Sequence, residues 1–473
     1  MTIRSDIPTC PERPAARSTG TSRDYEISLI TPLFGGGVKT RENDPSFAIR
    51  PTAIRGQLQF WWRATVGAQY ATTIELREEQ SKVWGDTKQS SRVQICVELV
   101  EKLSEPKVCA VIKPNHKGRD QVFWEPPFHN TSLPYALYPF QGKPANNEGP
   151  KVEPASCIHM AKFRLTIVCH IDVDFAKQVE PAIWAWVNFG GLGSRTRRGC
   201  GAIYCRELAP QRLDSVDKWY RDHVPEVSYG IRVWPTMPTS FLSYSQCGKP
   251  CDQWDRVIGL LRDFRQKPGN DPGYARPLGP DRSWYPEADT IRRITGRHSQ
   301  GHDPSRHLSG GNPLPDGFPR AEFGLPIVFK FIDDKSNEPK RSTLQPYVDG
   351  QQIDKGTANL PEFHTIGSEL KERMASPVIL KPLAFTKDIA VAIILPLQTR
   401  PLDNVALISD NGVDLIPQHA LPVRHTAFVA YPDSPIRGLT KTGSALEAFL
   451  NLALQKAGTN VAHPSTGYRR VPV

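Results

Sequence analysis

Residues 25–206 alternate between strand-like and helix-like periodicity in an order that few folds accommodate. The expected elements are, in chain order, a strand, a helix, a strand, a strand, a helix and a strand: Tyr25–Thr31, Thr52–Tyr70, Val93–Leu99, Phe163–Ile171, Phe175–Asn188 and Ala202–Arg206. This is the split β-α-β order of the ferredoxin-like (RRM-like) fold, an antiparallel sheet with helices on one face. The sequence therefore predicts an α+β protein whose first unit is ferredoxin-like.

A loop rich in glycine and arginine precedes the last of these strands. Residues 189–201 read FGGLGSRTRRGCG, without one acid. Glycine lets backbone N–H groups approach a partner closely, and arginine binds phosphate through two parallel hydrogen bonds. We therefore expect the loop to hold a phosphodiester backbone without reading its bases. The residues expected to make these contacts are Gly191, Gly193, Ser194, Arg195, Arg197 and Arg198. The alternative is a turn whose arginines are solvated.

A second glycine run follows the first strand. Residues 33–40 (LFGGGVKT) superficially suggest a phosphate-binding loop, but Val38 separates Gly37 from Lys39, and Leu33 stands where a P-loop begins with glycine. Nucleotide hydrolysis therefore has little support. Both glycine loops lie at the ends of elements of one expected sheet, so Lys39 is expected to add to the same surface. An ordinary turn after a strand is the alternative.

The first expected helix has an apolar stripe and a polar face. Arg55 and Arg63 lie on the polar face and are expected to extend the basic surface. Adjacent helical residues point about 100° apart, so Trp61 and Trp62 cannot both lie squarely on the stripe. Trp61 is expected in the core, and Trp62 is a candidate for base stacking or for an interface, with an ordinary packing role as the alternative.

The second half of the chain shows the same element types with weaker spacing. We expect a helix at Cys251–Arg265 and one beginning at Ser444, whose Ser-x-x-Glu pattern is a capping box. Strands are expected at Leu325–Ile332, Pro377–Phe385 and Ile389–Leu397. A second ferredoxin-like unit with loop insertions fits this pattern. The predicted organisation is a disordered tail at 1–24, a first domain at 25–225 and a second at 226–473, with long irregular segments over Pro106–Pro154 and insertions near Lys267–Arg282 and Asp333–Arg373.

The overall charge favours a polyanionic partner. The 473 residues include 59 Lys and Arg against 49 Asp and Glu, a formal net charge of +10. Nine cysteines are scattered singly, and residues 1–24 lack the apolar segment of a secretory signal. No apolar run reaches the length that spans a bilayer. We therefore expect a cytoplasmic protein with reduced thiols and no contact with a membrane.

Catalytic and metal-binding patterns are weak. A metal-independent ribonuclease needs a positioned acid and base, and the twelve histidines cluster poorly for that role. Cys247, Cys251, His298 and His302 could form a structural zinc site, but the cysteine gap is non-standard and glycines and proline surround the histidines. We therefore expect no catalytic residue, no cofactor and no metal, and leave the zinc site open.

Several segments resemble one protein family. Residues 27–37 (ISLITPLFGGG), 51–64 (PTAIRGQLQFWWRA) and 188–199 (NFGGLGSRTRRG) are similar to the RAMP superfamily of CRISPR proteins. Within it, they resemble the first-numbered Cmr subunit of type III-B effector complexes, as do residues 283–293, 318–329 and 373–382. The sequence departs from that pattern at Cys200, where an aromatic residue is expected, and in its extra loop sequence.

The resemblance implies two tandem ferredoxin-like domains and a non-catalytic, RNA-binding role. It places such a subunit at the tail of the complex, near the 3′ end of the guide RNA, where it helps engage target RNA beside other RAMP subunits. By motif, the RNA contacts would again fall on the loop arginines and on Arg55 and Arg63. The alternatives are a metal-independent RAMP endoribonuclease and a structural capping subunit with little direct RNA contact.

Overall fold

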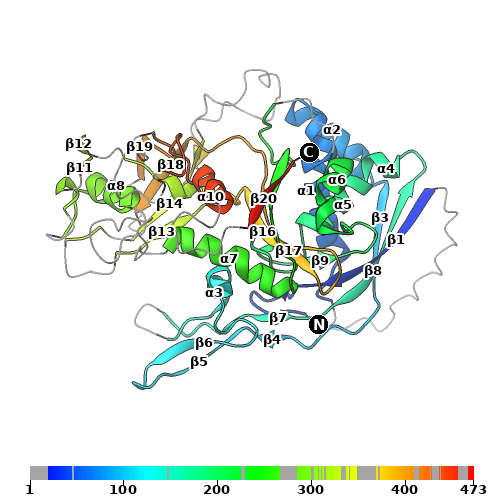
Figure 1. The fold of residues 1–473 in the computed structure, drawn as a ribbon, viewed down its shortest axis with the longest axis horizontal. Helices are drawn as coiled ribbons and strands as arrows, with labels where there is room; N and C mark the ends of the chain where they lie inside the picture. Colours follow the sequence, from blue (N-terminus) through cyan, green and yellow to red (C-terminus); the bar gives the residue numbers. More distant parts are fainter. Residues whose placement is uncertain are drawn as a thin grey trace, which may run out of the picture.

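The computed structural model describes most of the chain, and Figure 1 shows the arrangement of its elements. The described residues are 20–44, 47–145, 149–224, 230–266, 285–299, 303–306, 308–309, 312–313, 316–331, 337–339, 341–348, 369–370, 373–409, 415–426, 428, 436, 438–455 and 467–472. The helices are α1 (Pro51–Ala64), α2 (Thr73–Trp84), α3 (Leu133–Leu137), α4 (Phe175–Gln178), α5 (Glu180–Phe189), α6 (Val216–His223), α7 (Pro250–Gln266), α8 (Tyr285–Thr295) and α10 (Ala445–Leu454).

The strands lie in several antiparallel sheets. They are β1 (Gly20–Leu29), β2 (Leu33–Phe34), β3 (Val93–Leu99), β4 (Lys107–Val108), β5 (Ala110–Pro114), β6 (Asp120–Trp124), β7 (Ser156–Ile158), β8 (Lys162–His170), β9 (Ile203–Tyr204), β10 (Ser240–Tyr244), β11 (Leu308–Ser309), β12 (Asn312–Pro313), β13 (Ile327–Phe329), β14 (Ser342–Val348), β15 (Glu369–Leu370), β16 (Val378–Ala384), β17 (Ala390–Pro396), β18 (Asn404–Ser409), β19 (Leu415–Pro422) and β20 (Tyr468–Pro472).

The first four-stranded sheet has the order β3-β8-β1-β9, and every neighbouring pair is antiparallel. Tyr25 pairs with Leu165, and Ile95 with Ile167, which puts these apolar side chains on one face. Helix α1 follows β1, and α5 follows β8. The β-α-β-β-α-β order expected from the sequence is therefore present in residues 20–204, and β3 has the expected bounds.

Helices α1 and α5 cover the apolar face of this sheet. Helix α1 buries an apolar stripe that includes both Trp61 and Trp62, so Trp62 is a core residue and offers no surface for base stacking. Helix α5 is apolar on all sides, and every residue from Ala182 to Phe189 is buried. A helix of that kind needs cover on two sides, and the second unit supplies the other one.

The second four-stranded sheet has the order β16-β17-β10-β20 and repeats the topology of the first. Its elements follow along the chain as β10, α7, β16, β17, α10 and β20. All seven residues of β16 are buried, and the strand contacts both α7 and α5. One continuous apolar core contains residues of both sheets and of the helices between them.

A third sheet is inserted into the second unit. It has the order β13-β14-β18-β19, with β15 paired to β14, and has a separate core around Ile291, Phe318 and Leu344. Figure 1 shows this lobe and α8 on the side away from the first sheet. The region expected as an irregular insertion at Asp333–Arg373 therefore includes strands. The other expected insertion, Lys267–Arg282, lies entirely outside the described residues.

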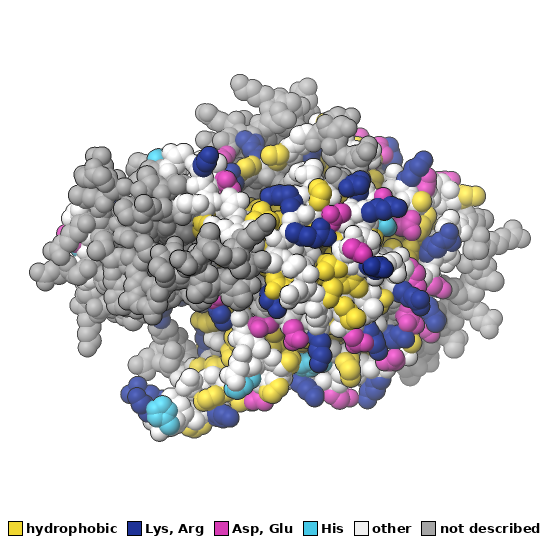
Figure 2. Space-filling model, viewed as in Figure 1, with side chains coloured by type: hydrophobic (Ala, Val, Ile, Leu, Met, Phe, Trp, Pro, Cys, Tyr) yellow, Lys and Arg dark blue, Asp and Glu magenta, His cyan; other side chains and the backbone are white. Residues whose placement is uncertain are grey.

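Two other expectations need correction. The tail was expected to reach residue 24, but β1 begins at Gly20, which pairs with His170. The proline-rich stretch Pro106–Pro154 was expected to be irregular, but it contains a hairpin of β5 and β6 and the short helix α3. The hairpin projects from the body, and its tip carries basic and histidine side chains (Figures 1 and 2).

The outer face of the first sheet carries paired charges. Lys162 lies 2.9 Å from Glu26, and Arg164 lies 3.0 Å from Glu98 across neighbouring strands. Figure 2 shows basic and acidic side chains interspersed over this part of the molecule. A phosphate backbone would meet both signs of charge here, so this face is a poor candidate for RNA. No helix among the described residues is long and apolar enough to cross a bilayer.

Candidate nucleic-acid interface

The glycine–arginine loop (Gly190–Gly201) lies between the two units. The backbone N–H of Leu192 donates to Gly201 O at 2.8 Å, and that of Ser194 donates to Phe34 O at 2.8 Å. The second bond places the loop beside the first glycine run, as expected. It also corrects a prediction, because these two N–H groups are used within the fold and are not free for phosphate.

The glycines of the loop are required by close packing. Gly193 has a φ of +75°, and a Cβ there would lie 2.3 Å from Phe34 O. Gly199 has a φ of +84°, and its Cβ would lie 2.5 Å from the Trp254 ring of α7. The indole N–H of Trp254 donates to Arg198 O at 2.6 Å. The loop therefore acts as a packed joint between β2 and the second unit.

The loop arginines differ in what they contact. Arg197 donates to Ser376 O, and its guanidinium lies 5.2 Å from the centre of the Phe60 ring. Arg198 donates to Val378 O at 2.9 Å and to Phe323 O at 3.3 Å. These acceptors are neutral carbonyl oxygens, so the bonds orient the two cations without neutralising them. Arg195 is exposed, in a left-handed conformation with a φ of +58°.

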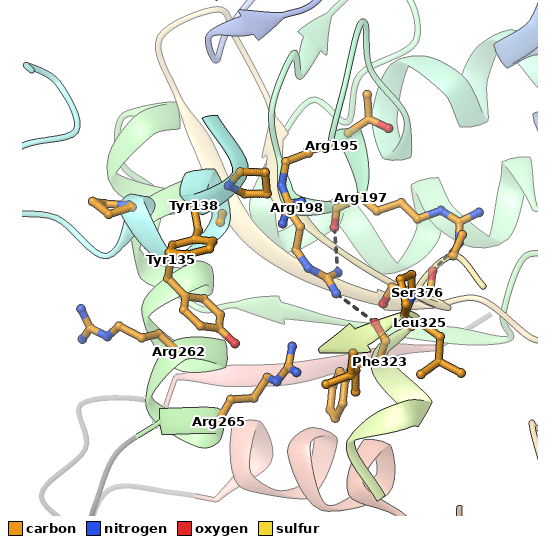
Figure 3. A pocket seen from close by; sticks show the side chains of 18 of the residues that line it. Tyr135, Tyr138, Arg195, Arg197, Arg198, Arg262, Arg265, Phe323, Leu325 and Ser376 are labelled. Carbon is orange, nitrogen blue, oxygen red and sulfur yellow. Dashed lines mark hydrogen bonds between the residues drawn. The ribbon is translucent and has the colours of Figure 1, made fainter. Parts of the chain in front are cut away.

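A pocket of about 1030 Å³ opens beside these arginines. Figure 3 shows that its walls come from both halves of the chain: α3 and the loop belong to the first half, and α7 and the segment around Phe323 to the second. Five arginines line it: Arg195, Arg197, Arg198, Arg262 and Arg265. The described lining residues include no Asp or Glu, although Arg262 is paired outside the lining with Asp263 at 2.8 Å.

The cations converge on one tyrosine. Figure 3 shows Arg198 and Arg265 directed into the space beside Tyr135, to whose hydroxyl Arg265 is hydrogen-bonded. Burial, together with the neighbouring Arg265 and Arg195, lowers the pKa of Arg198 to about 9. Burial also lowers the pKa of Arg265. Arg198 still remains charged at neutral pH, so the pocket attracts anions.

Three of the residues expected in the basic surface lie elsewhere. Arg55 donates to Trp84 O and to Val93 O, which ties α1 to the end of α2 and to β3. Arg63 donates to Gln80 Oε1 of α2 at 3.0 Å. The side chain of Lys39 is 78% exposed, 4.0 Å from Glu42. None of the three is among the described residues of the pocket wall. The expected site is therefore split: the loop arginines line the pocket, and these three residues lie outside it.

Sequence reasoning missed the half of the pocket that α7 and α3 supply. Arg262 and Arg265 stand three residues apart on α7, and Tyr135 is the middle residue of α3. Helical spacing puts the two arginines on one face, and that was the available signal. It did not indicate which distant segment the face would meet.

The zinc hypothesis gains nothing from the described residues. No group of three or more His, Cys, Asp or Glu side chains in that part of the chain is arranged to hold a metal ion. Cys251 is half-buried on α7, and burial raises the pKa of its thiol to about 11. His302 lies outside the described residues, so its role as a zinc ligand stays a prediction.

Comparisons with known proteins point to one family. The family model of the RAMP superfamily matches residues 26–204. The Cmr subunit Cmr1-2 of Pyrococcus furiosus is 25% identical over 194 residues, which are 40% of this chain and 97% of that relative. The Cmr subunit Cmr1-1 of the same organism is 26% identical over 194 residues, 41% of this chain, and the match spans half of that relative's length.

Solved structures show a looser likeness. The crystal structure of Cmr1 from Pyrococcus furiosus in its apo form has a TM-score of 0.41 and 16% identity, covering 80% of this chain and 89% of that one. A cryo-EM structure of the Type III-B Cmr-beta bound to cognate target RNA has a TM-score of 0.39 and 12% identity, covering 82% and 96%. These scores are too low to carry functional weight, so the relationship rests on the family match and the sequence relatives. Residues 26–204 thus match the RAMP superfamily, and over a similar length the chain is similar in sequence to the Cmr1 subunits of CRISPR systems.

Proposed function

We propose that this chain is a non-catalytic, RNA-binding subunit of a type III-B CRISPR effector complex. The observation that carries the proposal is the arginine-lined pocket, which both halves of a Cmr1-like chain build around one glycine–arginine loop. Arginine guanidinium groups suit phosphate, and carbonyl oxygens hold two of them in place while leaving their charge uncompensated. Contacts of this kind bind a backbone with little regard for sequence.

The rest of the proposal follows the relatives. The chain is built from two ferredoxin-like units, as the repeated strand order supports. It sits at the tail of the complex near the guide 3′ end, contacts other Cmr subunits of the RAMP family, and helps engage target RNA. Cleavage is carried out by other subunits. Guide and target RNA are both partners, and the protein acts in the cytoplasm.

Salt dependence of RNA binding tests the pocket directly. Arg195→Ala combined with Arg262→Ala removes two lining charges while keeping the Arg197 and Arg198 bonds to the second unit. We expect weaker binding of single-stranded RNA at every sequence, with the slope of log affinity against log salt falling by up to about two units. Fluorescence anisotropy over a range of salt concentrations measures both quantities.

The matched control is Arg212→Ala with Arg470→Ala, two arginines outside the pocket wall. This pair also removes two positive charges, so a general effect of net charge would appear in both variants. An unchanged slope in the pocket variant would contradict RNA binding in the pocket. Gel analysis of the recovered RNA shows whether the chain cuts it; cutting that depends on a histidine would favour the endoribonuclease alternative.

A further inference from the structure

Strand β3 forms one edge of the first sheet. It pairs with β8, and the order β3-β8-β1-β9 ends there among the described strands. The backbone N–H of His170 donates to Arg92 O at 2.9 Å, just before β3 begins. Just after β3 ends, the N–H of Val100 donates to Lys162 O at 3.0 Å. Because bonding alternates along an antiparallel strand, the even-numbered residues of β3 direct their backbone groups to β8, and the odd-numbered residues direct theirs outward.

The outward backbone groups are open over most of the strand. At its start, Val93 O accepts from Arg55 Nη1 at 3.3 Å, so this position is used within the fold. Further along, the outward N–H and C=O groups of Ile95, Val97 and Leu99 make no hydrogen bond to another described residue. A row of such groups is a template on which one more strand can pair.

Strand β3 also lacks the features that keep edge strands from pairing. Its seven residues, VQICVEL, include no lysine, arginine, proline or glycine, and its one charge, Glu98, lies 3.0 Å from Arg164 of β8. By contrast, the edge strand β20 carries Arg469, Arg470 and Pro472, and the edge strand β16 is buried throughout. Natural proteins protect long edges with charges, prolines or bulges, so this edge is suited to a partner strand.

The strand is complementary to itself when a second copy runs antiparallel to it. In the register centred on Cys96, Ile95 lies opposite Val97 of the second copy, and Val97 lies opposite Ile95. Both residues have outward backbone groups, so each of these pairs exchanges two hydrogen bonds. Their side chains lie on the face that the helices cover, where they are partly buried, and Leu99 is 40% exposed. A second copy would therefore extend the apolar layer over its uncovered margin.

The other face of the strand is also compatible with this register. Gln94, Cys96 and Glu98 are exposed there. Gln94 lies opposite Glu98 of the second copy, so an amide meets a carboxylate and no like charges are opposed. Cys96 lies opposite Cys96 of the second copy in a non-hydrogen-bonded pair, whose Cα atoms are about 4.5 Å apart. This separation is within the range of a disulfide, so the thiols can report on the pairing.

We propose that two copies of this chain associate through β3, antiparallel and in the register centred on Cys96, so that their first sheets form one continuous sheet. The surface is separate from the arginine-lined pocket, since none of residues 93–99 is among the described residues of the pocket wall. The proposal therefore goes beyond the RNA-binding function and does not depend on it.

The first experiment measures association of the full-length chain in reducing buffer. Sedimentation velocity at concentrations up to about 100 µM gives the dissociation constant of the dimer. Val97→Pro removes an outward N–H and leaves the bonds to β8, because proline is tolerated in an edge strand at such a position. We expect it to raise the dissociation constant at least about tenfold, since each copy loses one donor. The matched control is Val97→Thr, which keeps the N–H and the branched side chain and should retain the dimer.

The second experiment tests the register with disulfides. Diamide accepts two electrons and two protons from a pair of thiols, and we expect it to join Cys96 of one copy to Cys96 of the other. In a Cys96→Ser background, Gln94→Cys mixed with Glu98→Cys should crosslink. Neither should crosslink to itself, because identical positions are then about 13 Å apart. Peptide mapping separates these bonds from any at Cys247, which is also exposed.

The outcomes decide both the interface and its register. A chain that stays monomeric at about 100 µM overturns the proposal. A dimer that Val97→Pro leaves intact and that diamide does not join at Cys96 uses another surface, which also overturns it. Crosslinking of Gln94→Cys to itself overturns the register. The pocket variant Arg195→Ala with Arg262→Ala should dimerise normally, so a failure of RNA binding and a failure of association are distinguishable.

Discussion

One lysine is buried where the two units meet. Lys381 of β16 is buried, and its Nζ donates to Gly190 O at 2.8 Å and to Val187 O at 3.4 Å, at the carboxyl end of α5. A cation suits the negative end of a helix dipole. Burial nevertheless lowers the pKa of Lys381 from 10.5 to about 7. The folded protein thus binds this proton less tightly than the unfolded chain.

Stability should therefore rise with pH through the Lys381 titration. Between pH 7 and 10 the unfolded chain holds a proton on Lys381 that the folded state releases, so the free energy of unfolding increases by up to about 1.4 kcal/mol per pH unit. Urea unfolding at pH 7 and pH 9 measures the increase. In Lys381→Met the contribution disappears, so the pH dependence should flatten; parallel curves for the two proteins would contradict this account.

Gly199 is the second informative residue. Alanine there must adopt a φ of +84° and place its Cβ 2.5 Å from the Trp254 ring. We expect Gly199→Ala to lower the free energy of unfolding by about 1–3 kcal/mol. Gly56→Ala is the matched control, because no atom lies within 4 Å of its Cβ position in α1, and it should stabilise by about 0.5–1 kcal/mol. Equal changes in the free energy of unfolding at the two sites would show that the loop rearranges to accommodate a Cβ at residue 199.

At the scale of elements, the structure shows which sequence signals are reliable. The period-two pattern of β3 and the amphipathic pattern of α7 predict elements within a residue of their observed ends. Helix α2 was not predicted, because it buries just Leu76, Val83 and Trp84, which are too few to form an apolar stripe. The available signal was the complete capping box that Thr72 and Glu75 form at its start. The β5–β6 hairpin was not predicted either, because the prolines around it suggest irregular backbone.

The capping box expected at Ser444 forms in part. Ser444 Oγ accepts from the Glu447 backbone N–H at 3.1 Å, as predicted, but the Glu447 carboxylate accepts from Thr440 and Thr442. A distant residue, Glu322, completes the start of α10 by accepting from Ser444 Oγ and from the Leu446 N–H at 2.9 Å. Local spacing predicts the near partner, whereas the far partner depends on the inserted lobe.

Substitutions at this helix start should differ in cost. Ser444→Ala removes one cap and should lower the free energy of unfolding by about 1 kcal/mol. Glu322→Ala removes the shared carboxylate and leaves Arg424 and the α10 N–H without it, so the cost should be about 3 kcal/mol. Urea titration of both variants measures the order. A larger loss in Ser444→Ala would mean that Glu322 contributes little to α10.

At the scale of the whole molecule, the two sheets behave as one packed body. Helix α5 belongs to the first unit by sequence, yet it contacts β16 of the second, and one core runs through both. The pocket exists because of this docking, since Arg195 and Arg265 come from different units. Periodicity predicts the units separately but contains no information on how they dock. For that reason, the arginines of the loop were predicted and their partners on α7 were not.

Hydrogen exchange should show the shared core directly. Backbone amides of β8 and of β17 should be protected to a similar degree, because neither sheet keeps its cover when the other opens. Strands β14 and β18 have a separate core and should exchange faster. Native-state exchange followed by mass spectrometry gives all three rates. Strong protection of β8 with rapid exchange of β17 would show that the units open independently.

The late position of β20 has a consequence for synthesis. Strand β10 lies between β17 and β20, and its Ser240 pairs with Pro472, so one edge of β10 has no partner until residues 468–472 have been synthesised. At about 5–20 residues per second, this delay is on the order of tens of seconds. The outer side of α5 lacks its contact with β16 until residues 378–384 have been synthesised. Between the synthesis of α5 and that of β16 the nascent chain thus exposes apolar surface, and its yield in cells should depend on chaperones that shield such surfaces.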